Sequence, residues 1–506
     1  MTDHEFTRRE ALHAIRFLTG TDSYKLSHWA QYPPGTTRVY SNFTPRSSRV
    51  AGLDHVVFFG LQAFLQDWCG AAFDDFLALP EDVAVATYAD RVASIIGPSD
   101  DDFSRIRRLH QLGYLPLEFR ALPEGSLSPL RVPLLTVENT HPEFFWLTNY
   151  IESVMSAALW HPITSATLAW RLRTLLNTWA LRTTGSTEAV AWQGHDFSLR
   201  GLEGIDASGA SGAGHLLSFT GTDSLPALDF VDHHYGDDLT QHGHRNGLVG
   251  GSVPATEHSV MCAGGDENEA ETFARLLELY PTGIVSVVSD TWDLWKVATE
   301  ILPSLHDAVT ARAGKLVIRP DSGDPAKIVN GNPSAPHGSP EWLGLARLLA
   351  AEFGTTTNAR GYKVLDEHVG MIYGDSISYE RAEEICAGLE RLGFASTNVV
   401  LGVGSFTYQF VTRDTLGLAM KATWAEIRGE GRDLFKDPTT DDGTKRSARG
   451  RLAVLPDASG ELTLVECASA DDEDRSLLTP VWRDGRFLRT WNFADVREHL
   501  WGGRAG

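Results

Sequence analysis

The chain has 506 residues, of which 42% are hydrophobic and 22% charged, and it carries a formal net charge of −22 at pH 7. This length can bury a large core in more than one domain. The acidic balance argues against a protein that grips nucleic acid or anionic lipid, because such binding needs surplus cations. Small anionic ligands remain compatible with it, since a local cluster of cations is sufficient for them.

The cysteine pattern and the first residues of the chain indicate in which cellular compartment the protein is expected. The cysteines are far apart and form no CxxC pair, which predicts reduced thiols rather than a disulfide framework or a zinc site. The start lacks a basic segment followed by an apolar core, and no apolar run is long enough to cross a bilayer. We therefore expect a cytoplasmic protein with no membrane-spanning segment. The cysteines are Cys69, Cys262, Cys386 and Cys467.

Residues 1–165 are predicted to form an N-terminal α+β segment. Thr7 and Glu10 have the spacing of a capping box, which indicates a short helix that begins after Thr7. Arg38–Phe43 alternates between apolar and polar residues as a half-buried strand does, and Leu130–Val137 is a second predicted strand. The order of the strands in this segment does not follow from the sequence.

From about residue 166 the chain repeats one pattern, a short apolar run that ends abruptly in polar residues or glycine. Such runs are typical of parallel strands that are buried on both faces. Amphipathic helices, among them Phe273–Tyr280 and Ala382–Leu389, lie between the runs. We predict an irregular parallel α/β barrel over residues 166–410, with the polar strand ends at one mouth. The predicted strands are Ala189–Trp192, Leu216–Phe219, Ser252–Ala255, Ile284–Val288, Leu316–Ile318, Met371–Tyr373 and Val399–Leu401.

Residues 411–506 change pattern again. Arg451–Leu455 and Leu462–Glu466 alternate as strands do, which predicts a β-rich C-terminal segment. We expect this segment to pack with residues 1–165 rather than with the barrel. The predicted fold class is therefore α/β, an irregular parallel α/β barrel with an additional α+β domain formed by the N- and C-terminal segments.

Charged residues gather at the predicted strand ends. Carboxylates beside arginines suit a substrate that carries phosphates together with Mg²⁺, which prefers oxygen ligands. Carboxylates beside a sugar ring also stabilise the positive charge that develops on the anomeric carbon in glycosyl transfer. The turn Gly402–Ser405 is suited to present backbone N–H groups to a phosphate. The strand-end residues are Arg200, Asp223, Glu257, His258, Asp290, Arg319, Asp321 and Asp375.

A basic interval follows the barrel and suits a pyrophosphate group. Each candidate taken singly has a structural interpretation, because a strand-end Asp is often a helix cap, a lone histidine is often structural, and a charge run is usually solvated. Phe197 and Tyr24 would ordinarily be core residues. The agreement among many strand ends favours a binding site. The basic interval contains Arg413, Lys421, Lys436, Lys445, Arg446, Arg449 and Arg451.

Short motifs run in order along nearly the whole chain. They are Thr21–Lys25, Gln31–Pro34, Thr136–Thr140, Trp146–Asn149, His195–Phe197, Arg200–Gly201, Gly221–Asp223, Ser252–Ala255, Glu257–Ser259, Ser286–Asp290, Ile318–Gly323, Gly374–Asp375, Thr412–Asp414, Phe435–Pro438 and Lys445–Ser447. With these motifs the chain resembles the nicotinamide phosphoribosyltransferases, and most of all their bacterial members. The resemblance implies a type II phosphoribosyltransferase fold. The implied activity joins nicotinamide to 5-phosphoribosyl-1-pyrophosphate in NAD salvage, giving nicotinamide mononucleotide and pyrophosphate.

The resemblance also implies a pocket for the base. Phe197 would stack on one face of the pyridine ring, and Tyr24 from the second subunit of a homodimer would stack on the other. Asp223 would accept a hydrogen bond from the carboxamide N–H. The other residues of this pocket would be Arg200, Ser286 and Arg319.

For the sugar and phosphates, the resemblance implies that Asp321 and Asp375 hold the ribose hydroxyls beside Gly374. Asp290 would lie near the phosphates and bind Mg²⁺ with Asp321. His258 matches the histidine that ATP phosphorylates in this family, which couples ATP hydrolysis to turnover. The implied phosphate and pyrophosphate ligands, the cationic ones largely from the partner subunit, are Gly404, Ser405, Arg46, Arg413, Lys421, Lys436 and Lys445.

Asp223 also supports the choice of base on physical grounds. An ionised carboxylate gains a charge-assisted hydrogen bond from a carboxamide, but it repels the carboxylate of nicotinic acid. We therefore expect nicotinamide rather than nicotinate as the substrate. Two alternatives remain, a nicotinate phosphoribosyltransferase and a non-catalytic binding protein on the same scaffold.

Overall fold

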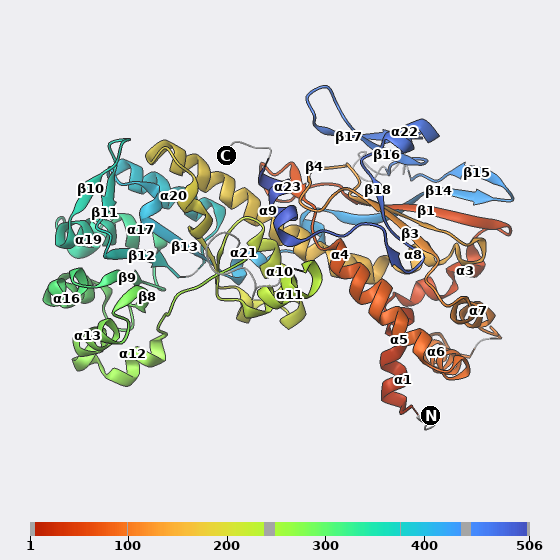
Figure 1. Cartoon of the computed structure of the whole chain (residues 1–506), viewed down its shortest axis with the longest axis horizontal. Coiled ribbons are helices and arrows are strands. Elements are labelled where there is room, and N and C mark those ends of the chain that lie inside the picture. The colour runs from red at the N-terminus through yellow and green to blue at the C-terminus, as the bar shows by residue number, and fades with distance from the viewer. Residues whose placement is uncertain (1–5, 99, 237–247, 375, 437–446, 503–506) are drawn as a thin grey trace. The chain divides into compact units, whose positions relative to one another are not determined.

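A computed structural model of the chain describes residues 6–98, 100–236, 248–374, 376–436 and 447–502 (Figure 1). The chain divides into two compact units. The terminal unit comprises Met1–Thr167, His233–Asp237 and Val411–Gly503, and the central unit comprises Leu168–Asp232 and Asp238–Phe410 with the last residues of the chain. Each unit has its own β-sheet and is described separately.

The central unit contains a six-stranded sheet in which every neighbouring pair of strands is parallel. Most apolar residues of its strands are buried, as the β-branched pattern predicts, although Ile284 in β8 is 43% exposed. The strands, in the order they occupy in the sheet, are β7 (Gly221–Thr222), β6 (Gly194–Asp196), β13 (Val399–Val403), β12 (Val369–Tyr373), β9 (Ala313–Arg319) and β8 (Thr282–Val288).

The segment 251–256 links the two outer strands of this sheet. Gly251 forms a parallel bridge to Gly221 at the end of β7, and Ala255 forms one to Ser286 in β8. The sheet therefore curls into an irregular parallel barrel, which confirms the predicted fold class. Segment 251–256 contains the predicted strand Ser252–Ala255, which makes isolated bridges instead of a regular strand.

Helices connect the barrel strands and cover them. The predicted helices Phe273–Tyr280 and Ala382–Leu389 are confirmed, except that the first ends one residue earlier, at Leu279. The main helices of the central unit are the second half of α9 (Glu152–Thr183), α10 (Ile205–Leu216), α12 (His258–Gly264), α13 (Glu269–Leu279), α19 (Leu345–Phe353) and α20 (Tyr379–Arg391).

Two predicted barrel strands are wrong. Ala189–Trp192 lies in a 3₁₀ helix (Glu188–Trp192), and β6 begins only at Gly194. Leu216–Phe219 follows α10, and the strand β7 comes after it. Short apolar runs bury equally well in a helical turn and in a strand, so periodicity alone does not separate the two. The polar residues that follow each run nevertheless lie at strand ends.

The terminal unit contains a seven-stranded antiparallel sheet in which the two ends of the chain meet, so its red and blue strands lie side by side in Figure 1. The long strand β1 pairs with β14 on one side and with β5 on the other. This sheet and its helices form the predicted α+β domain. The strands, in sheet order, are β15 (Glu430–Asp433), β14 (Leu418–Ile427), β1 (Thr36–Pro45), β5 (Leu135–Asn139), β3 (Leu117–Ala121), β18 (Thr479–Arg483) and β19 (Arg486–Phe487).

Local predictions for this unit are largely confirmed. Thr7 and Glu10 form a capping box at the start of α1, and Arg38–Phe43 lies within β1. The predicted strand Leu130–Val137 is wrong in its first half, which is a turn before β5. The other elements include the strand pairs β2 (His55–Val57) with β4 (Leu127–Pro129) and β16 (Leu452–Pro456) with β17 (Leu462–Glu466), and the helices α1 (Arg8–Ala14), α5 (Ala72–Ala78), α6 (Glu81–Ile96), α7 (Ser104–Leu112), α22 (Ala470–Arg475) and α23 (Phe493–Trp501).

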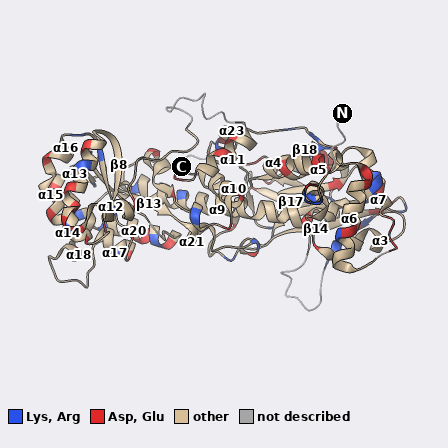
Figure 2. Ribbon diagram, turned by 90° about the horizontal axis from the view of Figure 1, so that it is seen from below, with Lys and Arg blue, Asp and Glu red and all other residues tan. Residues whose placement is uncertain are grey.

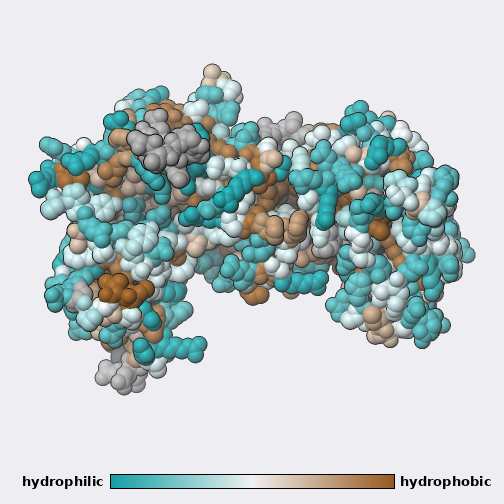
Figure 3. Space-filling view, turned by 180° about the vertical axis from the view of Figure 1, so that it is seen from behind, coloured by the Kyte–Doolittle hydropathy of each residue, from teal (hydrophilic) through white to brown (hydrophobic). Residues whose placement is uncertain are grey.

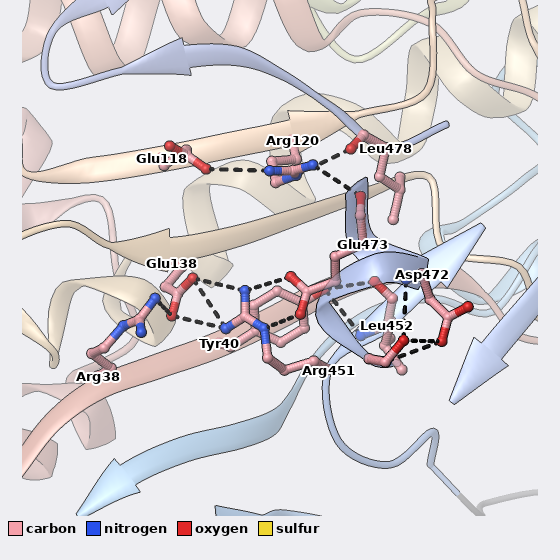
Figure 4. Close-up of polar contacts among 11 residues, drawn as sticks. Arg38, Tyr40, Glu118, Arg120, Glu138, Arg451, Leu452, Asp472, Glu473 and Leu478 are labelled. Carbon is pink, nitrogen blue, oxygen red and sulfur yellow. Dashed lines mark hydrogen bonds and ion pairs between the residues drawn. The ribbon is translucent and has the colours of Figure 1, made fainter. Parts of the chain in front are cut away.

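Arg451 joins three elements of the terminal unit (Figure 4). Its guanidinium pairs with Glu138 of β5 and with Glu473 of α22, and it lies 4.6 Å from the ring centroid of Tyr40 in β1. Arg449 likewise pairs with Asp433. These two arginines of the basic interval are therefore engaged in internal ion pairs.

The surface carries both signs of charge. Figure 2 shows acidic and basic residues distributed along both units, and the face in Figure 3 is mostly hydrophilic with scattered apolar patches. Within the part of the chain that the structure describes, no helix is long and apolar enough to cross a membrane.

Candidate functional site

Two adjoining cavities open at the carboxyl ends of the barrel strands. The inner cavity, of about 460 Å³, extends along the interior of the barrel, and the outer cavity, of about 540 Å³, lies over the strand ends. Phe197, Asp223 and Arg319 line both. The predicted residues Arg200, Asp321 and Gly374 line the outer cavity, and Ser286 lines the inner one. Seven of the predicted site residues thus meet at the mouth of the barrel.

The inner cavity has mostly apolar walls and a few polar groups. The Phe197 ring follows β6, and the Arg319 guanidinium at the end of β9 lies 6.0 Å from its centroid. Ser286 Oγ and Arg319 Nε are buried and make no hydrogen bond to any residue that the structure describes. Buried polar atoms of this kind usually have a partner, so they are suited to a ligand. A flat ring with polar substituents fits these walls.

Asp223 is held in place through one of its oxygens. Its Oδ1 accepts hydrogen bonds from Ser252 Oγ and from His195 Nε2, the latter at 2.8 Å. Burial raises the pKa of Asp223, but these hydrogen bonds and the charge of Arg319 outweigh it and keep the pKa below its ordinary value. Asp223 is therefore ionised at neutral pH.

His195 and Ser252 hold the Asp223 carboxylate at the candidate site, and the sequence motifs assigned no role to them. His195 is buried at the end of β6, and its ring centroid lies 4.6 Å from that of Phe197. It precedes Phe197 by two residues, and residues two apart in a strand lie on the same face. That spacing is a signal in the sequence by which His195 could have been found.

Asp290 and Asp321 stand together at the ends of β8 and β9. Asp290 Oδ2 accepts hydrogen bonds from the backbone N–H groups of Asp321, at 2.8 Å, and Ser322, at 2.7 Å. Asp290 Oδ1 is buried and has no hydrogen-bond partner among the described residues. An oriented carboxylate with one uncommitted oxygen beside a second carboxylate is a donor set that suits Mg²⁺.

His258, the first residue of α12, faces both carboxylates. Its Nε2 lies 3.9 Å from Asp290 Oδ1 and 3.9 Å from Asp321 Oδ2, and its Nδ1 lies 3.1 Å from Thr291 Oγ1. Its side chain is 47% exposed, so a reagent in solution can reach the ring. The structure therefore brings three of the predicted catalytic residues together. The fourth, Asp375, lies outside the described residues.

Gly374 and the predicted phosphate loop owe their positions to close contacts. A Cβ at Gly374 would lie 1.8 Å from Asp321 Oδ1, so only glycine fits beside that carboxylate. Gly404 and Ser405 lie where β13 turns into α21 (Ser405–Tyr408). A Cβ at Gly201 would lie 2.3 Å from Ser405 Oγ, which places this loop next to the segment that carries Arg200.

The remaining predicted residues belong to the terminal unit. Tyr24 is 60% exposed in the 3₁₀ helix Ser23–Ser27. Arg413 is half-exposed and pairs with Asp414, and Lys436 is exposed. Lys445 lies outside the described residues. Arg46 and Lys421 line a pocket of about 340 Å³ within this unit.

We call this third cavity the cationic pocket. Side chains on one face of β1 and β14 form part of it, because Asn42 pairs in register with Lys421, and Thr44 with Ala419. Burial lowers the pKa of Lys421, and although the charge of Glu152 raises it, the charge of Arg46 lowers it further. The other residues that line the pocket are Arg46, Arg131, Ser447, Ala448, Leu464 and Glu466.

Comparisons with known proteins were made for sequence and for structure. Residues 192–484 match the model of the nicotinate phosphoribosyltransferase (NAPRTase) family, and residues 16–75 match the nicotinamide phosphoribosyltransferase N-terminal domain. The chain is 49% identical over 499 residues to the nicotinamide phosphoribosyltransferase of Acinetobacter baylyi, covering 96% of this chain and 97% of the relative. It is 35% identical over 497 residues to the enzyme of the same name from Xanthomonas campestris pv. campestris, covering 95% and 97%.

Solved structures share the fold at low sequence identity. The nicotinate-nucleotide pyrophosphorylase from Pyrococcus furiosus aligns with a TM-score of 0.57 at 14% identity, covering 99% of this chain and 97% of that one. Human nicotinic acid phosphoribosyltransferase aligns with a TM-score of 0.54 at 17% identity, covering 95% and 92%. At such identities the likeness concerns the fold alone.

Proposed function

Because the chain belongs to the nicotinate phosphoribosyltransferase family, we propose that it transfers the phosphoribosyl group of 5-phosphoribosyl-1-pyrophosphate to nicotinamide. The products are nicotinamide mononucleotide and pyrophosphate. The observation that carries the choice of base is the ionised Asp223 at the inner cavity. The names of relatives that align over almost the whole chain support the same choice.

Asp223 discriminates between the two pyridine bases by charge. His195 and Ser252 engage its Oδ1, and its Oδ2 makes no hydrogen bond to the described residues. A carboxamide N–H donates to such an oxygen, whereas the carboxylate of nicotinic acid is repelled. Phe197 supplies an aromatic face for the ring, and the uncommitted Ser286 Oγ supplies a second polar contact.

The transfer requires no proton abstraction. The ring nitrogen of nicotinamide carries no hydrogen, and its lone pair forms the bond to the anomeric carbon. The bond from that carbon to the pyrophosphate oxygen breaks, and pyrophosphate leaves with the electron pair. Positive charge develops on the anomeric carbon, and the carboxylates of Asp290 and Asp321 in the outer region of the site stabilise it.

Asp290 and Asp321 would also hold Mg²⁺. The uncommitted Asp290 Oδ1 beside the carboxylate of Asp321 supports this assignment. When bound, the ion would neutralise charge on the leaving pyrophosphate. Asp290 itself is held ready by the N–H groups of Asp321 and Ser322, which fix its orientation before any ligand arrives.

The test of the function is product formation from each base. Wild-type protein with 5-phosphoribosyl-1-pyrophosphate and Mg²⁺ is expected to convert nicotinamide faster than nicotinic acid. In Asp223→Asn the repulsion is absent, so the ratio of kcat/KM values for the two bases is expected to fall at least about tenfold. Asp206→Asn, in α10 outside the cavities, is the control. Faster turnover of nicotinic acid by the wild type would make the chain a nicotinate phosphoribosyltransferase, and binding without product would make it a binding protein.

His258 is the proposed site of phosphorylation by ATP. Its exposure and its place beside Asp290 and Asp321 support this role. His258→Ala is expected to abolish the stimulation of turnover by ATP while leaving slow synthesis without ATP. His306→Gln, at a part-exposed histidine elsewhere in the central unit, is expected to keep the stimulation. ATP that still accelerates the His258→Ala protein would contradict the phosphohistidine.

A homodimer is proposed to complete the site. Tyr24, a large aromatic side chain that is 60% exposed, supports a role for it in another copy of the chain. Sedimentation is expected to give twice the 55.5 kDa of one chain. A monomer that turns over at the full rate would exclude the shared site.

A further inference from the structure

Arg131 has an unusual backbone conformation. It lies in the turn between β4 and β5 with a φ of 70°, in the left-handed region that favours glycine. Its backbone N–H donates a 2.6 Å hydrogen bond to Pro45 O, which ties the turn to the end of β1. A long side chain kept in a strained conformation points to a use for that side chain.

The Arg131 side chain lines the cationic pocket with Arg46 and Lys421. In the described ranges its guanidinium has neither an ion pair nor a hydrogen bond, whereas Arg451 and Arg449 of the same unit are paired. Glu466 is the carboxylate among the described lining residues, so the pocket carries a positive excess. Clustered cations repel one another, and an anion with several charges relieves that repulsion.

We propose that Arg131 binds the pyrophosphate group of the substrate and product, together with Arg46 and Lys421. This inference rests on the proposed function. A pyrophosphate has more acceptor oxygens than two cations satisfy, and an arginine fork binds two of them at once. Asn42, Thr44 and Ser447 add neutral hydrogen-bonding groups to the same pocket, whose volume of about 340 Å³ accommodates the group.

The alternative is that Arg131 occupies this turn without binding a ligand. The variant Arg131→Gly distinguishes this alternative from a role in binding pyrophosphate. Glycine suits the backbone, so the variant is expected to fold with an unchanged or raised Tm. If Arg131 binds the ligand, the Kd for inorganic pyrophosphate by calorimetry and the KM for 5-phosphoribosyl-1-pyrophosphate both rise about tenfold. The kcat changes less than about twofold, and Arg131→Lys recovers part of the affinity.

Arg428→Gly is the matched control. Arg428 also has a positive φ, 56°, and lies in the turn between β14 and β15, outside the pocket. Its replacement relieves the same kind of strain and is expected to leave both constants unchanged. The salt dependence of pyrophosphate binding should become shallower only in Arg131→Gly, because one cation is lost from the site.

The outcomes distinguish this inference from the proposed function. An unchanged pyrophosphate Kd in Arg131→Gly, with an active wild type, overturns the role of Arg131 alone. A wild type that forms no nicotinamide mononucleotide overturns the proposed function, and the pyrophosphate titration still decides whether Arg131 binds the anion. Equal weakening in Arg428→Gly would show a general effect of turn strain and overturn the inference as well.

Discussion

The two units present their functional side chains in different ways. In the central unit the strands are parallel, and Asp290, Arg319 and Asp321 sit directly after strands whose carboxyl ends share one edge. In the terminal unit the strands are antiparallel, and Asn42 and Lys421 line a pocket from the middle of paired strands. In the parallel sheet the functional side chains lie at the strand ends, whereas in the antiparallel sheet they lie on one face of the strands. A search of the sequence for polar residues at strand ends therefore finds only the first kind of site.

The units also differ in the sign of the charge they present. Asp223, Glu257 and Asp321 line the outer cavity of the central unit, and backbone N–H groups orient the neighbouring Asp290. The cationic pocket of the terminal unit has Arg46, Arg131 and Lys421. This difference fits our proposal that the central unit supports bond breaking and the terminal unit binds the anion. Variants in the central unit are therefore expected to change the rate of bond breaking, and variants in the terminal unit are expected to change the affinity for the anion.

The largest effect is expected from Asp290→Asn. The substitution keeps the shape of the side chain but removes a negative charge beside the developing positive charge, so kcat is expected to fall at least about a thousandfold. Binding of pyrophosphate in the absence of Mg²⁺, measured by calorimetry, is expected to change little, because Asp290 then holds no ion for the anion. Asp293→Asn, at a helix cap after β8, keeps an oxygen that can accept the capping hydrogen bonds, so it should change stability little and keep kcat. Equal loss of kcat in both variants would contradict the assignment.

A second effect is the acid sensitivity of the central unit. His215 is fully buried, its Nδ1 lies 2.6 Å from Tyr408 Oη, and burial lowers its pKa from 6.5 to about 4. Between these values the unfolded chain binds the proton and the folded chain does not, so the free energy of unfolding falls as the pH falls from about 6.5 to 4. The loss is about 3 kcal/mol.

His215→Gln tests this origin. The variant is expected to be less stable at pH 7, because buried hydrogen bonds are altered, but to lose less further stability down to pH 4. Denaturant unfolding of both proteins at pH 7, 5.5 and 4 measures the two slopes. If the free energy of unfolding falls equally with pH in the wild type and the variant, the acid sensitivity arises from other groups, such as carboxylates.

The smallest effect is expected from Lys421→Gln in the cationic pocket. Loss of one charge–phosphate contact should raise the KM for 5-phosphoribosyl-1-pyrophosphate about tenfold and change kcat less. Arg432→Gln, at an exposed position of β15, is the control and should leave KM unchanged. Steady-state kinetics at two ionic strengths measures both. A fall in kcat without a change in KM would contradict the proposal that the terminal unit acts in anion binding and the central unit in bond breaking.

Several features followed from the sequence by local physics. The runs at Ile284–Val288 and Leu316–Ile318 are strands, as their β-branched residues predict, and most of their side chains are buried or half-buried. The meeting of Asp290, Asp321 and His258 followed from the rule that parallel strands share one carboxyl edge. The predictions at Ala189–Trp192 and Leu216–Phe219 were wrong, because short apolar runs carry too few residues to reveal their period.

The residues at the barrel mouth could be listed from the chain alone, since each strand and its polar end are neighbours in sequence. The contacts between residues far apart in the chain became visible only in the folded units. His195 reaches Asp223 because β6 and β7 lie side by side, and Arg131 reaches the cationic pocket because its turn is tied to the end of β1. Such contacts depend on strand order and register, which arise from packing between segments far apart in the chain and leave no local pattern in it.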